Sequence, residues 1–160
     1  MKTTISTSSN KKQFAFDIIF TGLLVALCLV ISLRLLPFAE DDAYIHFRIA
    51  QNFARNFAPY FNPGEPVMST SSFVWTSLLA FLSLLKLSLP ISVAVLNPVF
   101  TVLGAFVWSR LLVNYTGKRS RSLLVILFQL GYVGLMLLSY VGLMESPFAL
   151  LLLGLGVTGL

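Results

Sequence analysis

The stretch FAFDIIFTGLLVALCLVISLRLLP, residues 14–37, is apolar except for Asp17 near its start and Arg34 near its end. A helix of this length can cross the hydrocarbon core of a bilayer, which is about 30 Å thick. The stretch is longer than the apolar part of a secretory signal peptide, and no small-residue cleavage site follows it. It therefore predicts an uncleaved transmembrane helix over residues 14–36.

The composition of the 160-residue chain also indicates a membrane protein. Apolar residues make up 57% of it and charged residues only 11%, and the mean hydropathy is +0.88. Soluble domains carry about 25% charged residues, so this chain lacks the polar surface that would keep it in water. Further apolar segments cover residues 72–85, 91–113, 123–140 and 147–160. The predicted fold is therefore all-α and polytopic, with about four transmembrane spans.

The last apolar segment, residues 147–160, runs to the final residue without a polar cap. A complete membrane protein rarely stops halfway through a helix. We therefore expect residues 147–160 to be the start of an incomplete fourth span, and the chain to be a truncated product or a fragment.

Basic residues gather beside the apolar segments in two places. They are Lys2, Lys11 and Lys12 before the first segment, and Arg110, Lys118, Arg119 and Arg121 around the end of the third. By the positive-inside rule, residues 1–13 form a cytoplasmic tail and residues 114–122 a cytoplasmic loop. The basic residues behind the net charge of +5 then determine the orientation of the spans in the membrane. We therefore expect no nucleic-acid partner.

An even number of spans must separate two cytoplasmic segments, yet three apolar segments lie between these two. Segment 72–85 is the shortest, and its length suits a re-entrant or interfacial helix better than a span. We therefore expect spans at residues 14–36, 91–113 and 123–140 of a protein integral to the cytoplasmic (inner) membrane. Residues 37–90 become a long external loop that carries juxtamembrane helices.

Acidic residues lie near the start of this external loop. Glu40, Asp41 and Asp42 directly follow the first span, and residues 43–57 have the spacing of an amphipathic helix. Its apolar face is expected at Ile45, Ile49, Phe53 and Phe57, and its polar face at Tyr44, Arg48, Gln51, Asn52 and Arg55. The helix would lie flat on the outer leaflet, with two carboxylates at its start.

Two interpretations of these polar residues remain open. Asp is a favoured N-cap residue and is stabilised by the helix dipole, while arginines at this depth can contact lipid phosphates. Alternatively, one carboxylate is a general base and the other, Asp42, binds a divalent cation that neutralises a departing phosphate. Arg48 and Arg55 would then bind the phosphate of a lipid-linked sugar. The lone His46 is a metal ligand or, as is commoner for such a residue, a polar interfacial side chain.

Several separated motifs occur in a recognisable order. They are Asp41-Asp42-Ala43-Tyr44-Ile45-His46-Phe47-Arg48 with Gln51-Asn52, then residues 61–67, then residues 70–76, and finally Gly142-Leu143-Met144-Glu145-Ser146-Pro147-Phe148. In these motifs the chain resembles the GT-C superfamily of integral-membrane glycosyltransferases, in the branch of the mycobacterial terminal arabinofuranosyltransferase and its bacterial relatives. The resemblance covers residues 35–153. It implies an extracytoplasmic active site, with Asp41 or Asp42 as base or metal ligand and Glu145 as a further acid. His46 departs from the small or aromatic residue usual in that family.

The predicted function is transfer of a sugar from a polyprenyl-phosphate donor to a cell-envelope glycan, glycolipid or protein on the outer face of the membrane. The predicted catalytic residues are Asp41, Asp42 and Glu145, and the predicted substrate-binding residues are Tyr44, Arg48, Asn52 and Arg55. A divalent cation is the cofactor that this chemistry suggests. The alternative is a catalytically inactive fragment or split-gene subunit. A transport component, the third option, predicts charges at mid-membrane, whereas these acids lie at span ends.

Overall fold

The computed structural model describes residues 7–62, 70, 72–116, 122–137, 139 and 142–159. These residues form six α-helices and no strand, so the predicted all-α class is confirmed for the described part of the chain. The helices are α1 (Thr7–Arg34), α2 (Asp41–Asn56), α3 (Phe73–Leu84), α4 (Leu89–Thr116), α5 (Ser122–Leu135) and α7 (Ser146–Thr158), with a short 3-10 helix η1 at Leu36–Phe38. The basic residues Lys118, Arg119 and Arg121, and Glu65 of the motif at residues 61–67, lie outside the described residues.

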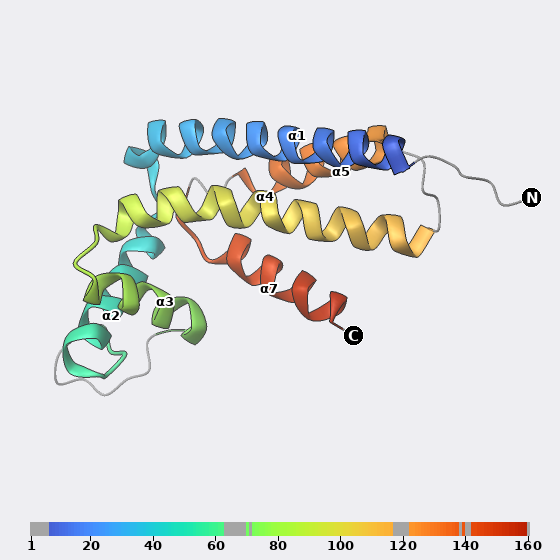
Figure 1. The fold of residues 1–160 in the computed structure, drawn as a ribbon. Helices are drawn as coiled ribbons and strands as arrows, with labels where there is room; N and C mark the ends of the chain where they lie inside the picture. The colour runs from blue at the N-terminus through green and yellow to red at the C-terminus, as the bar shows by residue number, and fades with distance from the viewer. Residues whose placement is uncertain are drawn as a thin grey trace, which may run out of the picture.

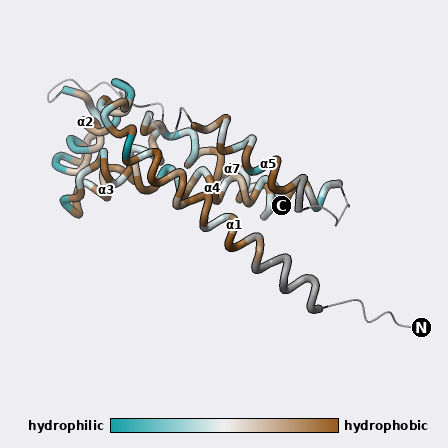
Figure 2. The backbone as a smooth tube through the Cα atoms, turned by 90° about the horizontal axis from the view of Figure 1, so that it is seen from above, coloured by the Kyte–Doolittle hydropathy of each residue, from teal (hydrophilic) through white to brown (hydrophobic). Residues whose placement is uncertain are grey.

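Helix α4 is the centre of the arrangement, because it contacts α1, α3, α5 and α7. Helices α2 and α3 pack on each other at one end of the molecule, where α1 ends and α4 begins (Figure 1). The start of α1 and the end of α4 lie at the opposite end. Hydrophilic residues concentrate around α2, whereas α4 and the coloured part of α1 are mainly hydrophobic (Figure 2).

Membrane-spanning length is reached by one helix of the described structure, over Leu89–Leu112 of α4. Four other apolar helices are shorter: Ile18–Arg34 of α1, all of α3, Val125–Leu135 of α5, and α7. Among the described helices, one is therefore long and apolar enough to cross a membrane. The polytopic arrangement stays a prediction.

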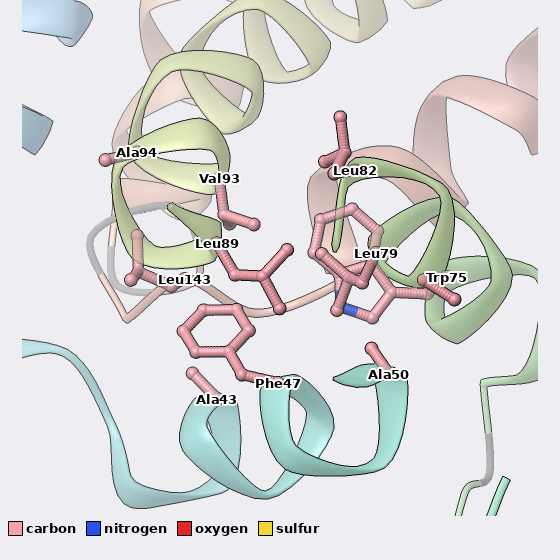
Figure 3. Packing of buried hydrophobic residues seen from close by; sticks show 11 residues of the cluster. Ala43, Phe47, Ala50, Trp75, Leu79, Leu82, Leu89, Val93, Ala94 and Leu143 are labelled. Carbon is pink, nitrogen blue, oxygen red and sulfur yellow. The ribbon is translucent and has the colours of Figure 1, made fainter. Parts of the chain in front are cut away.

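The larger hydrophobic core joins α2, α3 and the start of α4 (Figure 3). From α2 it takes Ala43, Phe47 and Ala50, whose spacing puts them on one face of the helix. These side chains meet Trp75 and Leu79 of α3, and Leu89, Val93 and Ala94 of α4 complete the cluster. A smaller core between α1, α4 and α5 contains the buried Cys28, which forms no disulfide.

The predicted apolar face of α2 is wrong in part. Ile49 is buried, but Ile45 is 40% exposed and Phe57 is 83% exposed, because Phe57 is the left-handed C-cap residue and lies beyond the helix. The packed face is instead centred on two alanines. Small side chains let α2 approach α3 and α4 closely, and a pattern that counts large apolar residues overlooks them.

Helix α7 packs on α4 through a small residue as well. A Cβ atom added to Gly154 would lie 3.0 Å from a methyl carbon of Val107 and 3.1 Å from Nε1 of Trp108. The Trp108 Nε1–H donates a hydrogen bond of 3.0 Å to the Leu150 carbonyl oxygen. The approach of α7 to α4 therefore depends on a glycine at position 154.

We expect Gly154→Val to destabilise the protein by about 1–3 kcal/mol, the usual cost of overpacking a close contact. Gly156→Val is the matched control, since a Cβ atom at position 156 has nothing within 4 Å. Thermal unfolding of the two variants in the same detergent measures the difference. Equal unfolding temperatures would show that α7 does not pack on α4 at Gly154.

Candidate functional site

Glu145 lies where three segments of the chain meet. It occupies the N-cap position of α7, but its side chain makes no capping hydrogen bond. Its Oε1 instead accepts a hydrogen bond of 2.9 Å from the Ser72 hydroxyl at the start of α3. Its Oε2 lies 3.7 Å from Nε2 of His46 on α2. We refer to Glu145, Ser72 and His46 as the carboxylate cluster.

The turn that carries Glu145 is held from two sides. The backbone N–H of Glu40 donates to the Gly142 carbonyl at 3.3 Å, and the Asn97 side-chain amide of α4 donates to the Met144 carbonyl at 2.9 Å. Between them, Leu143 is 1% exposed and has a φ of 62°, a left-handed conformation that is unfavourable for a residue with a side chain. Burial of the leucine and the two hydrogen bonds stabilise this conformation, and they place Glu145 beside α2.

Ser72 is positioned by two threonines. The Thr70 hydroxyl accepts the backbone N–H of Ser72 at 3.2 Å and forms a second hydrogen bond of 2.8 Å with the Thr76 hydroxyl. Both threonines are buried. The Ser72 hydroxyl therefore points from a fixed backbone toward the carboxylate.

His46 is part of this cluster, although sequence reasoning favoured a simple interfacial role for it. Its side chain is 12% exposed and that of Glu145 is 23% exposed. Nδ1 of His46 and Oε2 of Glu145 are buried without a hydrogen-bond partner among the described residues. Unsatisfied buried polar atoms cost about 1–3 kcal/mol each, and native structures retain few of them. The cluster thus has unused hydrogen-bonding capacity.

Asp41 and Asp42 are exposed side chains in the first turn of α2. The N-cap residue of this helix is Glu40, with φ −71° and ψ 149°, so the N-cap interpretation of either aspartate is wrong. Their position in the first turn is still favourable to the helix dipole. Asp42 precedes His46 by four residues, which puts the two side chains on the same face of α2.

Arg48 and Asn52 bind the loop that follows α2. The Arg48 Nε–H donates to the Phe61 carbonyl at 3.2 Å, and the guanidinium lies over the Phe61 ring at 4.5 Å. The Asn52 amide donates to the Tyr60 and Phe61 carbonyls, at 2.9 Å each. Both side chains therefore hold the loop at Tyr60 and Phe61 against α2.

Tyr44 and Arg55, the other predicted substrate-binding residues, lie apart from each other. Tyr44 is 51% exposed and packs edge-on against Phe47, with 5.7 Å between ring centroids. Arg55 lines a cavity of about 430 Å³ together with Gln51, Ser83 and Lys86. Two positively charged side chains, Arg55 and Lys86, line this cavity, so it suits an anionic group. Sequence reasoning missed Lys86, which follows α3 and has a left-handed backbone with φ 58°.

A larger groove of about 710 Å³ lies between the start of α3 and one face of α7. Ser72 and Glu145 are polar residues of its lining, and most of the remainder is apolar, including Phe73, Phe148, Leu152 and Gly156. Trp75 also lines the groove, and its indole N–H is buried without a hydrogen-bond partner among the described residues. No residue lines both this groove and the Arg55 cavity. The structure therefore separates two predicted site residues, Glu145 and Arg55, into different cavities.

The described residues do not form a metal site by themselves. No group of three His, Cys, Asp or Glu side chains among them is close enough to bind a metal ion. Asp42, the predicted metal ligand, thus has no set of partner ligands among the described residues.

Comparisons with protein-family models, curated proteins and solved structures find no significant match for this chain.

Proposed function

We propose that this chain belongs to a membrane-embedded glycosyltransferase that moves a sugar from a polyprenyl-phosphate donor to a cell-envelope acceptor. The observation that carries the proposal is the position of Glu145. Its carboxylate lies 3.7 Å from His46 on α2, the helix that begins with Asp41 and Asp42. Two acidic motifs that are about a hundred residues apart in the sequence are thereby neighbours, as a shared active site requires.

The proposed reaction is a displacement at the anomeric carbon of the sugar. The acceptor oxygen forms a bond to this carbon while the bond to the donor phosphate breaks, and the bonding electron pair leaves with the polyprenyl phosphate. The acceptor hydroxyl loses its proton to a carboxylate, which we assign to Asp42 or Asp41 as general base. The exposed Arg48 of α2 supplies positive charge for the phosphate. Arg55, the other predicted phosphate ligand, lines a different cavity from Glu145 and is not part of this step.

Membrane insertion is the second part of the proposal. Helix α1 exposes Ile19, Leu23, Leu27 and Val30, each at least 56% accessible, in a stripe with near-helical spacing. A large exposed apolar stripe is unfavourable in water and suits a lipid environment. We propose that α1, α4, α5 and α7 cross the inner membrane and that α2 and α3 lie at its outer surface. The location of α2 and α3 at the end opposite to the start of α1 supports this arrangement (Figure 1).

The topology can be tested with single cysteines at Ser88 and Ser120 in a Cys28→Ser background. Ser88 lies between α3 and α4, at the proposed outer surface, and position 120 lies in the proposed cytoplasmic loop. We expect a membrane-impermeant thiol reagent, applied to whole cells with access across any outer membrane, to label position 88 and spare position 120. Labelling at 120 but not at 88 would contradict the topology and the external location of Glu145.

The transfer itself is tested with synthetic polyprenyl-phosphate sugars. Membranes that contain the full chain and membranes that lack it are incubated with radiolabelled hexose and pentose donors. We expect label to move from one of these donors to membrane or envelope material only when the chain is present. If no donor is consumed although the protein accumulates in the membrane, the catalytically inactive alternative is favoured instead.

A further inference from the structure

The cavity of about 430 Å³ beside the ends of α2 and α3 is positively charged. Arg55 lines it from the last turn of α2, and Lys86 lines it from the turn that follows α3. Neither side chain forms an ion pair or a hydrogen bond with a described residue. The described residues that line the cavity include no acid. We refer to it as the basic cavity, and within the described structure its two cations are not neutralised.

Lys86 occupies a backbone position where glycine is usual. Its φ is 58°, and its backbone N–H donates to the Ser83 carbonyl at 2.9 Å. The Leu87 N–H donates to the Leu82 carbonyl at 3.2 Å, which completes a Schellman motif at the end of α3. In this motif the left-handed residue is most often glycine, because it has no Cβ atom. The chain thus has a cation beside the cavity at a position that backbone geometry alone would assign to glycine.

The helix dipoles offset part of this positive charge but not all of it. The C-terminus of an α-helix is equivalent to about −0.5 charge, so the ends of α2 and α3 together offset about one of the two cations. About one positive charge remains, which matches the single negative charge of a phosphodiester. Gln51 and Ser83 also line the cavity, and each can donate a hydrogen bond to a phosphate oxygen.

Exposed leucines line the same cavity. Leu84 is 58% exposed and Leu87 is 48% exposed. A soluble phosphodiester would leave both side chains in water, whereas a phospholipid would place its acyl chains beside them and its phosphate beside the cations. A zwitterionic head group brings a cation of its own, and the described lining has no acidic side chain to bind it. The combination favours a lipid with a net negative charge.

We propose that the basic cavity binds the phosphate of an anionic phospholipid through Arg55 and Lys86, with the acyl chains beside Leu84 and Leu87. This site is separate from sugar transfer, since no residue lines both the basic cavity and the groove at Glu145. The location of the lipid in the outer leaflet rests on the proposed function, in which α2 and α3 lie at the outer surface. The binding itself does not depend on transfer and is tested without it.

The test measures lipid binding to the full chain in micelles of an uncharged detergent by native mass spectrometry, which counts the lipids bound to each protein molecule. Phosphatidylglycerol is compared with phosphatidylcholine of the same acyl chains, so that only the head group differs. Glycerophosphoglycerol, which is the phosphatidylglycerol head group without acyl chains, is added in molar excess to distinguish a lipid from a soluble phosphodiester. The micelle has no anionic surface, so binding reports a site and not a surface potential.

Three variants locate the binding. Arg55→Gln removes one cation and keeps a good helix former. Lys86→Gly removes the other cation and suits the left-handed backbone at that position. Arg34→Gln is the matched control, because Arg34 is an exposed arginine in the last turn of α1 and does not line the basic cavity.

We expect the native chain to bind one phosphatidylglycerol molecule about tenfold more tightly than phosphatidylcholine, and to retain it in excess glycerophosphoglycerol. A basic residue near an anionic lipid raises the affinity about fivefold, so Arg55→Gln and Lys86→Gly should each lower phosphatidylglycerol binding by about that factor. Arg34→Gln should change the affinity by less than about twofold, because an exposed charge outside the site contributes little.

Equal binding of the two lipids would overturn the proposal. Displacement of phosphatidylglycerol by glycerophosphoglycerol would also overturn it, because the occupant would then be a soluble phosphodiester. A loss in Arg34→Gln as large as in the two cavity variants would show that the lipid is attracted by charge in general and not bound in the cavity. Selective phosphatidylglycerol binding without sugar transfer would support the site and count against the proposed function. Sugar transfer without selective binding would overturn the lipid site alone.

Discussion

Asp42→Asn is expected to lower sugar transfer by about 100- to 10,000-fold, in protein that still inserts and accumulates normally. The range is that of a lost general base. Asn keeps the size and hydrogen bonding of Asp but removes the proton-accepting charge. Folding should be unaffected, because the Asp42 side chain is exposed and Glu40 is the N-cap residue. Rates of transfer from a polyprenyl-phosphate sugar measure the effect.

Asp41→Asn is the companion variant, since one of the two aspartates is expected to be the base. The four-residue spacing from Asp42 to His46 favours Asp42, because it puts Asp42 on the same face of α2 as His46, which lies 3.7 Å from Glu145. Glu145→Gln should weaken transfer, and Glu65→Gln, the control acid of the same predicted external loop, should leave it nearly intact. If both Asp→Asn variants keep most of the activity at normal expression, the carboxylates are structural and the catalytic assignment is wrong.

Phe47→Ala should cost about 3–5 kcal/mol of stability, the range for truncating a buried phenylalanine. Phe47 is 4% exposed and lies in the centre of the core that joins α2 to Trp75, Leu79 and Leu89 (Figure 3). Phe57→Ala is the matched control, because Phe57 is 83% exposed at the end of the same helix. Unfolding followed by circular dichroism in a single detergent compares the two.

The control should change stability by no more than about 0.5 kcal/mol. Phe47→Ala should also lower transfer, since a loosened α2 moves His46 away from Glu145. Similar losses of stability in Phe47→Ala and Phe57→Ala would mean that α2 does not pack on α3 and α4 through this face.

Local pattern predicted much of the helical framework. The apolar segment at residues 91–113 is α4, and the short segment at 72–85 is the separate helix α3. The amphipathic helix expected at 43–57 is α2, displaced by one or two residues at each end. These features depend on residues that are close in the sequence, so composition and spacing are sufficient to find them. The packed face of α2 was harder to predict from the sequence, because Ala43 and Ala50 contribute little hydrophobicity. Their small size is what lets α2 pack closely on its neighbours.

The carboxylate cluster could not be predicted from spacing. Ser72 and Glu145 are 73 residues apart, and no periodicity relates them. Their contact depends on the left-handed turn at Leu143 and on the Asn97 hydrogen bond to Met144, both of which are tertiary features. The resemblance to a transferase family selected Glu145 but not its partners, and it treated His46 as a departure. The structure adds that Nε2 of His46 lies 3.7 Å from the Glu145 carboxylate.

We propose that the start of α2 and the Glu145 turn form one site for sugar transfer. The most direct measurement is a double-mutant cycle in the transfer assay, with the native protein, Asp42→Asn, Glu145→Gln and the double variant. Residues that act as a unit are strongly non-additive. We expect the native protein to transfer sugar and the double variant to be about as slow as the slower single variant. Effects that multiply in the double variant, or an absence of transfer by the native protein, would contradict the claim.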